Sequence, residues 1–154
     1  MKEFIIDVNI PFSSSSPVYP SYFFSDLRKP GKIGVVIGGS KYSEEIKKHK
    51  LLLNLINQLL SAKRARKVNN EIVDEHQDRL VEKISEKFSS GCPGECDDLH
   101  IFALAHVGKC PNVLTNDTRM ASCRDQIREV VGHSLCPQIR VISSKNAYNA
   151  TTQQ

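Results

Sequence analysis

Short apolar runs alternate along the chain with longer segments of helical periodicity. The short runs are rich in β-branched residues, which predicts buried strands at 3–8, 32–37, 112–115 and 139–143. In the longer segments apolar residues recur every three or four positions, which predicts helices at 43–67, 70–88, 98–108 and 118–131. Strands that alternate with helices are typical of a mostly parallel sheet with helices on both faces. The pattern therefore predicts a three-layer α/β/α fold.

Two segments depart from this alternation. The stretch 11–31 is rich in serine, proline and aromatic residues, and it predicts an ordered loop with one short helix at 22–27. Residues 146–154 are mostly polar, which predicts a flexible tail. The rest of the chain has the length of one domain. We therefore expect a single domain over residues 1–145.

The overall charge and hydropathy exclude little. A formal net charge of +4 and a pI of about 8.8 permit a polyanionic partner without requiring one. No apolar run approaches the roughly 20 residues that span a bilayer. The N-terminal stretch MKEFIIDVNI lacks the features of a secretory signal peptide. These observations predict a cytoplasmic protein without a membrane segment.

The five cysteines are odd in number, and in a reducing compartment they are expected to be free thiols. They are Cys92, Cys96, Cys110, Cys123 and Cys136. Because Cys92 and Cys96 precede His100 and His106, a zinc site is one alternative. A C-x3-C spacing without a second matching pair is poor evidence for zinc. Buried thiols around the turn CPGEC are the favoured interpretation.

Acidic residues stand where strands end and where helices begin. Asp7 and Asp117 follow apolar strands, whereas Glu44, Glu45 and Asp98 begin helices. In an open α/β sheet these positions lie at the carboxyl ends of the strands, where ligands bind. Singly, Asp98 and Asp117 are also ordinary helix caps or turn residues, and the two glutamates are ordinary first-turn acids. Together, converging carboxylates repel one another unless a cation lies between them, which predicts a divalent metal site.

The order and spacing of these acids resemble the PIN-domain family, a metal-dependent ribonuclease fold found in many bacterial toxins and RNA-processing factors. The strand ending IIDVNI matches the first family motif, D-x-N, through Asp7 and Asn9. The segment DDLHIFALA matches the third motif through Asp98, with Ala105 at the expected small position. The strand ending VLTND matches the fourth motif, T-x-D. The family's glutamate corresponds to Glu44 or Glu45, and we prefer Glu45 because it directly precedes the apolar Ile46.

This resemblance, which spans residues 2–143, implies a cytoplasmic endoribonuclease that uses Mg²⁺ or Mn²⁺ and leaves a 5′-phosphate. The implied metal ligands and catalytic residues are Asp7, Glu45, Asp98 and Asp117. The implied substrate contacts are Asn9, Thr115, Asn116, Lys47 and Lys48. RNA is the implied substrate, and an antitoxin protein and a second copy of the chain are the implied partners. The chain departs from the family in its Ser/Pro-rich segment after Asn9 and in lacking a second acid soon after Asp117.

Two other interpretations remain open. The strand at 32–37, the turn GGS and the following helix resemble a loop that cradles a phosphate at a helix N-terminus. That loop lacks both the G-x-G-x-x-G pattern and a Walker lysine-serine pair. The second alternative is a PIN-like module that binds RNA or protein without cutting. The retention of all four acids argues against it.

Overall fold

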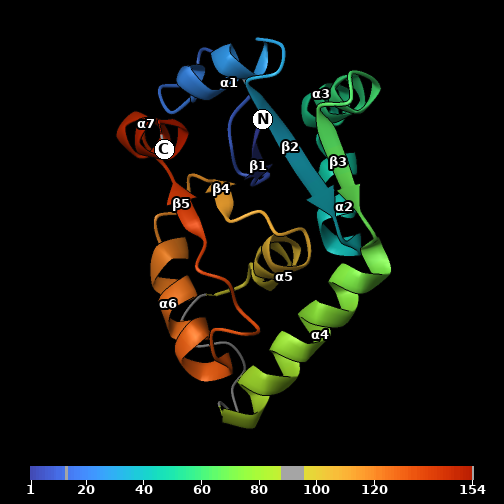
Figure 1. Cartoon of the computed structure of the whole chain (residues 1–154), viewed down its shortest axis with the longest axis vertical. Helices are drawn as coiled ribbons and strands as arrows, with labels where there is room; N and C mark the ends of the chain where they lie inside the picture. The colour runs from blue at the N-terminus through green and yellow to red at the C-terminus, as the bar shows by residue number, and fades with distance from the viewer. Residues whose placement is uncertain (13, 88–95, 154) are drawn as a thin grey trace.

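The computed structural model describes residues 1–12, 14–87 and 96–153, and within these ranges five strands form one parallel sheet (Figure 1). The strands in chain order are β1 Lys2–Ile6, β2 Ile33–Gly38, β3 Ala65–Val68, β4 Asn112–Leu114 and β5 Arg140–Ile142. Their order in the sheet is β3-β2-β1-β4-β5, and every neighbouring pair is parallel. The chain therefore extends the sheet from β1 first in one direction and then in the other.

Helices cover both faces of this sheet. In chain order they are α1 Ser21–Leu27, α2 Ser40–Lys47, α3 Lys50–Ser61, α4 Asn70–Lys87, α5 Leu99–Val107, α6 Met120–Val131 and α7 Lys145–Thr152. Figure 1 shows α1, α3 and α7 above the strands and α4, α5 and α6 below them. This arrangement confirms the expected three-layer α/β/α fold. None of the described helices is both long enough and apolar enough to cross a membrane.

The central strands are buried on both faces. Phe4, Ile5 and Ile6 of β1 have no exposed surface, and neither do Val35 and Val36 of β2. Strands that are covered by helices on both faces need apolar side chains at successive positions rather than at alternate ones. This requirement explains why the runs FII and VVI identified these strands in the sequence.

The prediction of a single helix at 43–67 is wrong. The structure divides this segment into α2, α3 and the strand β3. His49 begins α3 by accepting a hydrogen bond from the Leu52 N–H, and Lys63 takes a positive φ of 57° where the chain turns back. At Ala65–Val68 the exposed central residues are basic because β3 is an edge strand that pairs only with β2. The sequence signal of this strand was therefore weak.

The tail expected at 146–154 is also wrong over most of its length, because α7 occupies it. Ser144 caps α7 by accepting a hydrogen bond from the Ala147 N–H. Tyr148 is only 2% exposed, and its hydroxyl donates to Asp26 Oδ2 at 2.7 Å. One buried aromatic ring and one hydrogen bond to α1 thus hold a segment whose composition indicated disorder.

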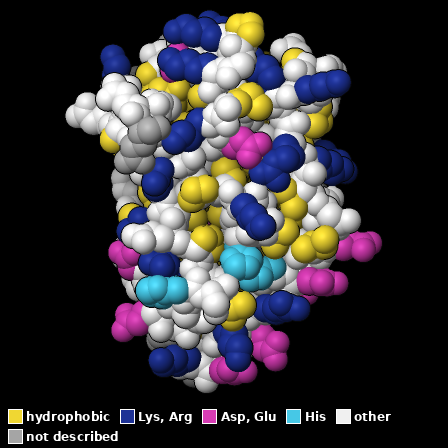
Figure 2. Space-filling model, viewed as in Figure 1, with side chains coloured by type: hydrophobic (Ala, Val, Ile, Leu, Met, Phe, Trp, Pro, Cys, Tyr) yellow, Lys and Arg dark blue, Asp and Glu magenta, His cyan; other side chains and the backbone are white. Residues whose placement is uncertain are grey.

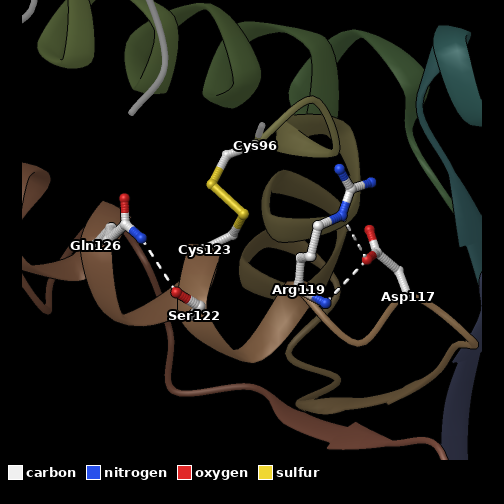
Figure 3. Close-up of a disulfide and its surroundings, with 6 residues drawn as sticks. All are labelled: Cys96, Asp117, Arg119, Ser122, Cys123 and Gln126. Atoms are coloured by element: carbon white, nitrogen blue, oxygen red, sulfur yellow. Dashed lines mark hydrogen bonds and ion pairs between the residues drawn. A yellow bond between two sulfur atoms is a disulfide. The ribbon is translucent and has the colours of Figure 1, made fainter. Parts of the chain in front are cut away.

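The expectation of five free thiols is corrected by a disulfide between Cys96 and Cys123 (Figure 3). Cys110 and Cys136 are free and buried, as expected. Cys92 lies outside the described residues, as does Phe88 at the expected end of α4. The disulfide joins the segment before α5 to the first turn of α6, so it connects two helices on the same face of the sheet.

We predict that the ion-pair cluster around Asp26 stabilises the fold at neutral pH. Lys29 Nζ lies 3.1 Å from its carboxylate and Lys32 Nζ lies 2.9 Å from it. Burial alone would raise the pKa of Asp26, but hydrogen bonds from Lys32, Tyr148 and Lys29 outweigh it and lower the pKa from 3.8 to about 2. The resulting stability of about 2 kcal/mol is present above pH 4 and is lost as the pH falls towards 2.

Urea denaturation of Asp26→Asn should therefore show a free energy of unfolding that is about 2 kcal/mol below the wild type at neutral pH. The difference should shrink in acid. Asp78→Asn, on the exposed surface of α4, is the matched control and should unfold like the wild type. Equal stability of Asp26→Asn and the wild type at neutral pH would contradict this role.

Candidate active site

A cleft of about 480 Å³ opens at the carboxyl ends of β1 and β4. Because β1 lies between β2 and β4, the connections from β1 and β4 leave towards opposite edges of the sheet. Such a switch point is where open α/β sheets bind their ligands. All four acids expected at the site line this cleft: Asp7, Glu45, Asp98 and Asp117. Their predicted convergence is thus present in the structure.

The Thr115 hydroxyl joins the ends of β1 and β4. It donates to Asp7 Oδ2 at 2.7 Å and accepts a hydrogen bond from the Asp117 N–H at 3.0 Å. Thr115 has no exposed surface. It therefore orients the Asp7 carboxylate and holds the backbone of Asp117, and its contact with a substrate stays a prediction.

Asn9 closes the loop that follows β1. Its Oδ1 accepts a hydrogen bond from the Asn116 N–H at 3.2 Å, and its own backbone N–H bonds to the Asp7 carboxylate. Burial raises the pKa of Asp7, and the hydrogen bonds from Thr115 and from the Asn9 backbone only partly offset this rise. Because Asn9 also lines the cleft, it remains a candidate for substrate contact, whereas Asn116 participates in this loop contact through its backbone.

Glu45 is held by His100, a residue that sequence reasoning missed. His100 Nε2 lies 3.1 Å from Glu45 Oε2, and His100 is only 1% exposed. Burial lowers the pKa of His100 to about 4, so near neutral pH the ring is uncharged and Nε2–H donates to the carboxylate. His100 Nδ1 is buried without a hydrogen-bond partner. The neighbouring Glu44 is exposed and does not line the cleft, which favours Glu45 as the site glutamate.

Asp117 is paired with Arg119, a second residue that the sequence analysis missed (Figure 3). The Arg119 backbone N–H and Nε both donate to Asp117 Oδ1, at 2.9 Å and 3.2 Å. Burial would raise the pKa of Asp117, but these hydrogen bonds outweigh it and lower the pKa. Asp117 is therefore a carboxylate at neutral pH.

Asp98 carries the electrostatic repulsion of the cleft. It precedes α5 at the N-cap position, but its side chain makes no capping hydrogen bond, which argues against an ordinary cap. Burial raises the pKa of Asp98 to about 7, and the carboxylates of Asp7, Asp97, Asp117 and Glu45 add to the rise. A divalent cation among these oxygens would relieve the repulsion.

The ligand atoms of the cleft are of the type that suits a divalent metal, but the side chains are not already arranged around a metal position. Carboxylate oxygens are the ligands that Mg²⁺ and Mn²⁺ prefer, and the cleft offers them from four elements of the chain. Within residues 1–12, 14–87 and 96–153, no three His, Cys, Asp or Glu side chains form a group that could hold an ion as they stand. Binding would therefore require the carboxylates to move closer together.

The cationic residues of the cleft differ in part from those expected. Lys48 lines it, but Lys47 does not. His49, Asp97 and Arg119 line it as well, although the sequence analysis did not select them. The dipeptide at Asp97 and Asp98 was visible in the sequence, but His49 and Arg119 carry no motif. Only the packing of α2 and of the β4–α6 loop places them at the cleft.

The glycine turn between β2 and α2 does not offer a phosphate cradle. The Gly39 N–H donates to Asn70 Oδ1 and the Ser40 N–H donates to Asp74 Oδ1, both at 2.9 Å. The Ser40 hydroxyl donates to Asp74 Oδ2. A carboxylate of the chain itself thus occupies the position that an anion would take, which argues against the phosphate-binding alternative.

We predict that the stability of the metal-free protein falls as the pH rises through the titration of Asp98. Because the folded pKa of Asp98 is raised from 3.8 to about 7, stability is lost between pH 4 and pH 7. Asp98→Asn removes this dependence, so its advantage over the wild type should grow as the pH rises from 4 and reach about 4 kcal/mol near pH 7. Thermal melts in EDTA measure it, with Glu44→Gln as the control that follows the wild type. Parallel curves for Asp98→Asn and the wild type would refute the assignment.

We also predict that the disulfide stabilises the loop that carries Asp98. Breaking it in the double variant Cys96→Ser, Cys123→Ser should lower the free energy of unfolding by about 2–4 kcal/mol, because it frees a loop in the unfolded chain. Dithiothreitol should destabilise the wild type by a similar amount and leave the double variant unchanged. Denaturation curves with and without reductant measure this. A wild type that is insensitive to reductant would argue against the bond.

No protein-family model, no curated protein and no solved structure matches this chain. The assignment of a function therefore depends on the residues and geometry of the cleft.

Proposed function

We propose that the protein is a metal-dependent endoribonuclease that hydrolyses phosphodiester bonds with Mg²⁺ or Mn²⁺. The observation that carries this proposal is the meeting of Asp7, Glu45, Asp98 and Asp117 in one cleft at the switch point of the sheet. The raised pKa of Asp98, caused first by burial and then by the other carboxylates, supports a site suited to a divalent cation.

The four carboxylates would hold the metal. When bound, it would supply a water of lowered pKa and neutralise charge on the phosphate. Thr115 fixes the carboxylate of Asp7, His100 fixes that of Glu45, and Arg119 fixes that of Asp117. Such supporting hydrogen bonds orient metal ligands and maintain their charge. The donors to Asp7 and Glu45 come from distant parts of the chain, whereas Arg119 lies two residues after Asp117.

Two cationic side chains of the cleft suit a nucleic-acid substrate. Lys48 and Arg119 line the cleft beside the carboxylates. Lysine ammonium groups and arginine guanidinium groups are the usual contacts to phosphate oxygens. We propose that they contact the phosphates next to the scissile bond, together with Asn9. The net charge of +4 supports association with a polyanion.

A PIN-like protein that binds RNA without cutting is the second candidate. It is favoured by the ion pair between Arg119 and Asp117, which already neutralises one carboxylate, and by the absence of a closed three-ligand group among the described side chains. A toxin role with an antitoxin partner and a homodimer stay predictions drawn from the family resemblance, and a cytoplasmic location stays a prediction drawn from the sequence composition.

Cleavage of labelled single-stranded RNA in Mg²⁺, in Mn²⁺ and in EDTA tests the proposal. We expect metal-dependent cleavage that falls by at least about 100-fold in Asp98→Asn and in Glu45→Gln, because each loses a ligand. Glu44→Gln is the matched control and should cleave like the wild type, because Glu44 is exposed outside the cleft.

Calorimetric titration with Mn²⁺ separates the two candidates. A folded protein that binds RNA but neither binds Mn²⁺ nor cleaves RNA would support the non-catalytic module. Equal loss of cleavage in Glu44→Gln and Glu45→Gln would contradict the assignment of Glu45.

A further inference from the structure

A second hollow of about 390 Å³ lies beside the acidic cleft, between α1 and α3. Its walls come from the loop before α1, from α1 and α3 themselves, and from the turn that leads into β3. Aromatic and aliphatic side chains form most of these walls. We call this hollow the aromatic groove and describe it by Phe12, Tyr19, Phe24, Leu51, Arg28 and Arg64.

Three aromatic rings form one wall of the aromatic groove in a fixed arrangement. Phe24 is 6% exposed and belongs to the core, so it anchors the other two. The ring of Tyr19 stacks on it with centroids 5.2 Å apart and planes at 9°. The ring of Phe12 packs against it at 5.1 Å. Phe12 and Tyr19 are only partly buried, so a ligand in the groove meets aromatic surface that the core already holds in place.

The charge of the aromatic groove is positive. Among the described residues that line it, the charged ones are Arg28 and Arg64, and none is acidic. Arg64 is held in position because its Nη2 donates to the Ile33 carbonyl at 3.0 Å. Figure 2 shows lysine and arginine side chains predominating over the upper half of the molecule, where α1 and α3 lie, and acidic side chains gathered around the lower half. The groove thus suits an anionic ligand.

One pair of packed rings connects the wall of the aromatic groove to the wall of the acidic cleft. The Phe12 ring lies 5.0 Å from the His49 ring, centroid to centroid. Phe12 lines the groove, and His49 lines the cleft next to Lys48. A single chain-like ligand held in the cleft would therefore enter the groove by passing this pair of rings. Such a ligand needs both anionic groups for the arginines and flat apolar groups for the aromatic wall.

We propose that the aromatic groove binds the bases and phosphates of the single-stranded RNA that flanks the phosphodiester in the acidic cleft. This inference rests on the proposed nuclease function. Stacking of bases on aromatic rings contributes about 1–3 kcal/mol per base with little sequence preference. Arg28 and Arg64 would hold the phosphates of the same segment. An acidic peptide also fits the chemistry of the groove, but the contact of Phe12 with His49 of the cleft favours the substrate strand.

The test compares a long substrate with a short one. The long substrate is a labelled RNA of about 12 nucleotides, which spans both cleft and groove, and the short one is bis(p-nitrophenyl) phosphate, which reaches only the cleft. Tyr19→Ala should lower kcat/KM for the RNA by about 5- to 100-fold, the range that loss of one stacked base implies. Arg28→Ala should also lower it, because a phosphate contact is lost. The ratio of kcat/KM for the RNA to kcat/KM for the ester should fall by the same factor. Tyr19→Phe, which keeps the ring, should restore that ratio.

Arg79→Ala, on the exposed surface of α4 away from both hollows, is the matched control and should act like the wild type. Arg28→Ala should also flatten the salt dependence of RNA binding, by about 0.7 in the log–log slope for each lost phosphate contact. Fluorescence anisotropy in EDTA measures this binding without cleavage.

The outcomes separate the two proposals. Both substrates could be cleaved with metal while the ratio of RNA to ester turnover stays unchanged in Tyr19→Ala and Arg28→Ala. This result would overturn the groove inference and leave the nuclease proposal standing. A peptide would then be the next ligand to test. Weakened RNA binding in these variants without cleavage by the wild type would support the groove and overturn the nuclease. A folded wild type that neither binds nor cleaves RNA would overturn both.

Discussion

The hydrogen bond from Thr115 Oγ1 to Asp7 Oδ2, 2.7 Å long, joins the two halves of the sheet at its switch point. It depends on the parallel pairing of β1 with β4, which places the end of one strand beside the end of the other. The same hydroxyl accepts the Asp117 N–H, so one buried side chain anchors the Asp7 carboxylate and the backbone of Asp117. Thr115 could be replaced only by a side chain that both donates and accepts in this buried position.

The cleft places several carboxylates close together, and hydrogen bonds from neighbouring residues hold three of them in place. Asp7, Glu45 and Asp117 each accept a hydrogen bond from a neighbour that stabilises the ionised form. Burial nevertheless raises the pKa of Asp7 and of Glu45, and burial together with the remaining carboxylates raises that of Asp98 to about 7. Proteins retain such strain mainly where function needs it. Three buried acids with raised pKa values, held in place by hydrogen bonds, are the feature that supports the proposed cation site.

Two long-range connections hold the periphery of the fold. The Cys96–Cys123 disulfide links the segment before α5 to α6, and Tyr148 links α7 to Asp26 on α1. Both connect residues that are distant in sequence, so neither is visible in local composition. The disulfide lies directly before Asp97 and Asp98 and thereby restrains the approach to the cleft. Packing of α3 against the loop before α1 similarly creates the aromatic groove, whose parts are separated along the chain.

The sequence alone determined the fold class, the strands β1, β2, β4 and β5, the helices α1, α4, α5 and α6, and the four acids that meet in the cleft. These features follow from periodicity and from the rule that strand ends face one edge of a sheet, both of which are local or topological. Tertiary structure decided the rest. The edge strand β3 and the helix α7 form because neighbours pair with or bury segments of unremarkable composition. The hydrogen bond between His100 and Glu45 was not predicted, because a contact between distant residues depends on packing that no local pattern records. Arg119 lies only two residues after Asp117, but no motif marks it as the partner of that acid.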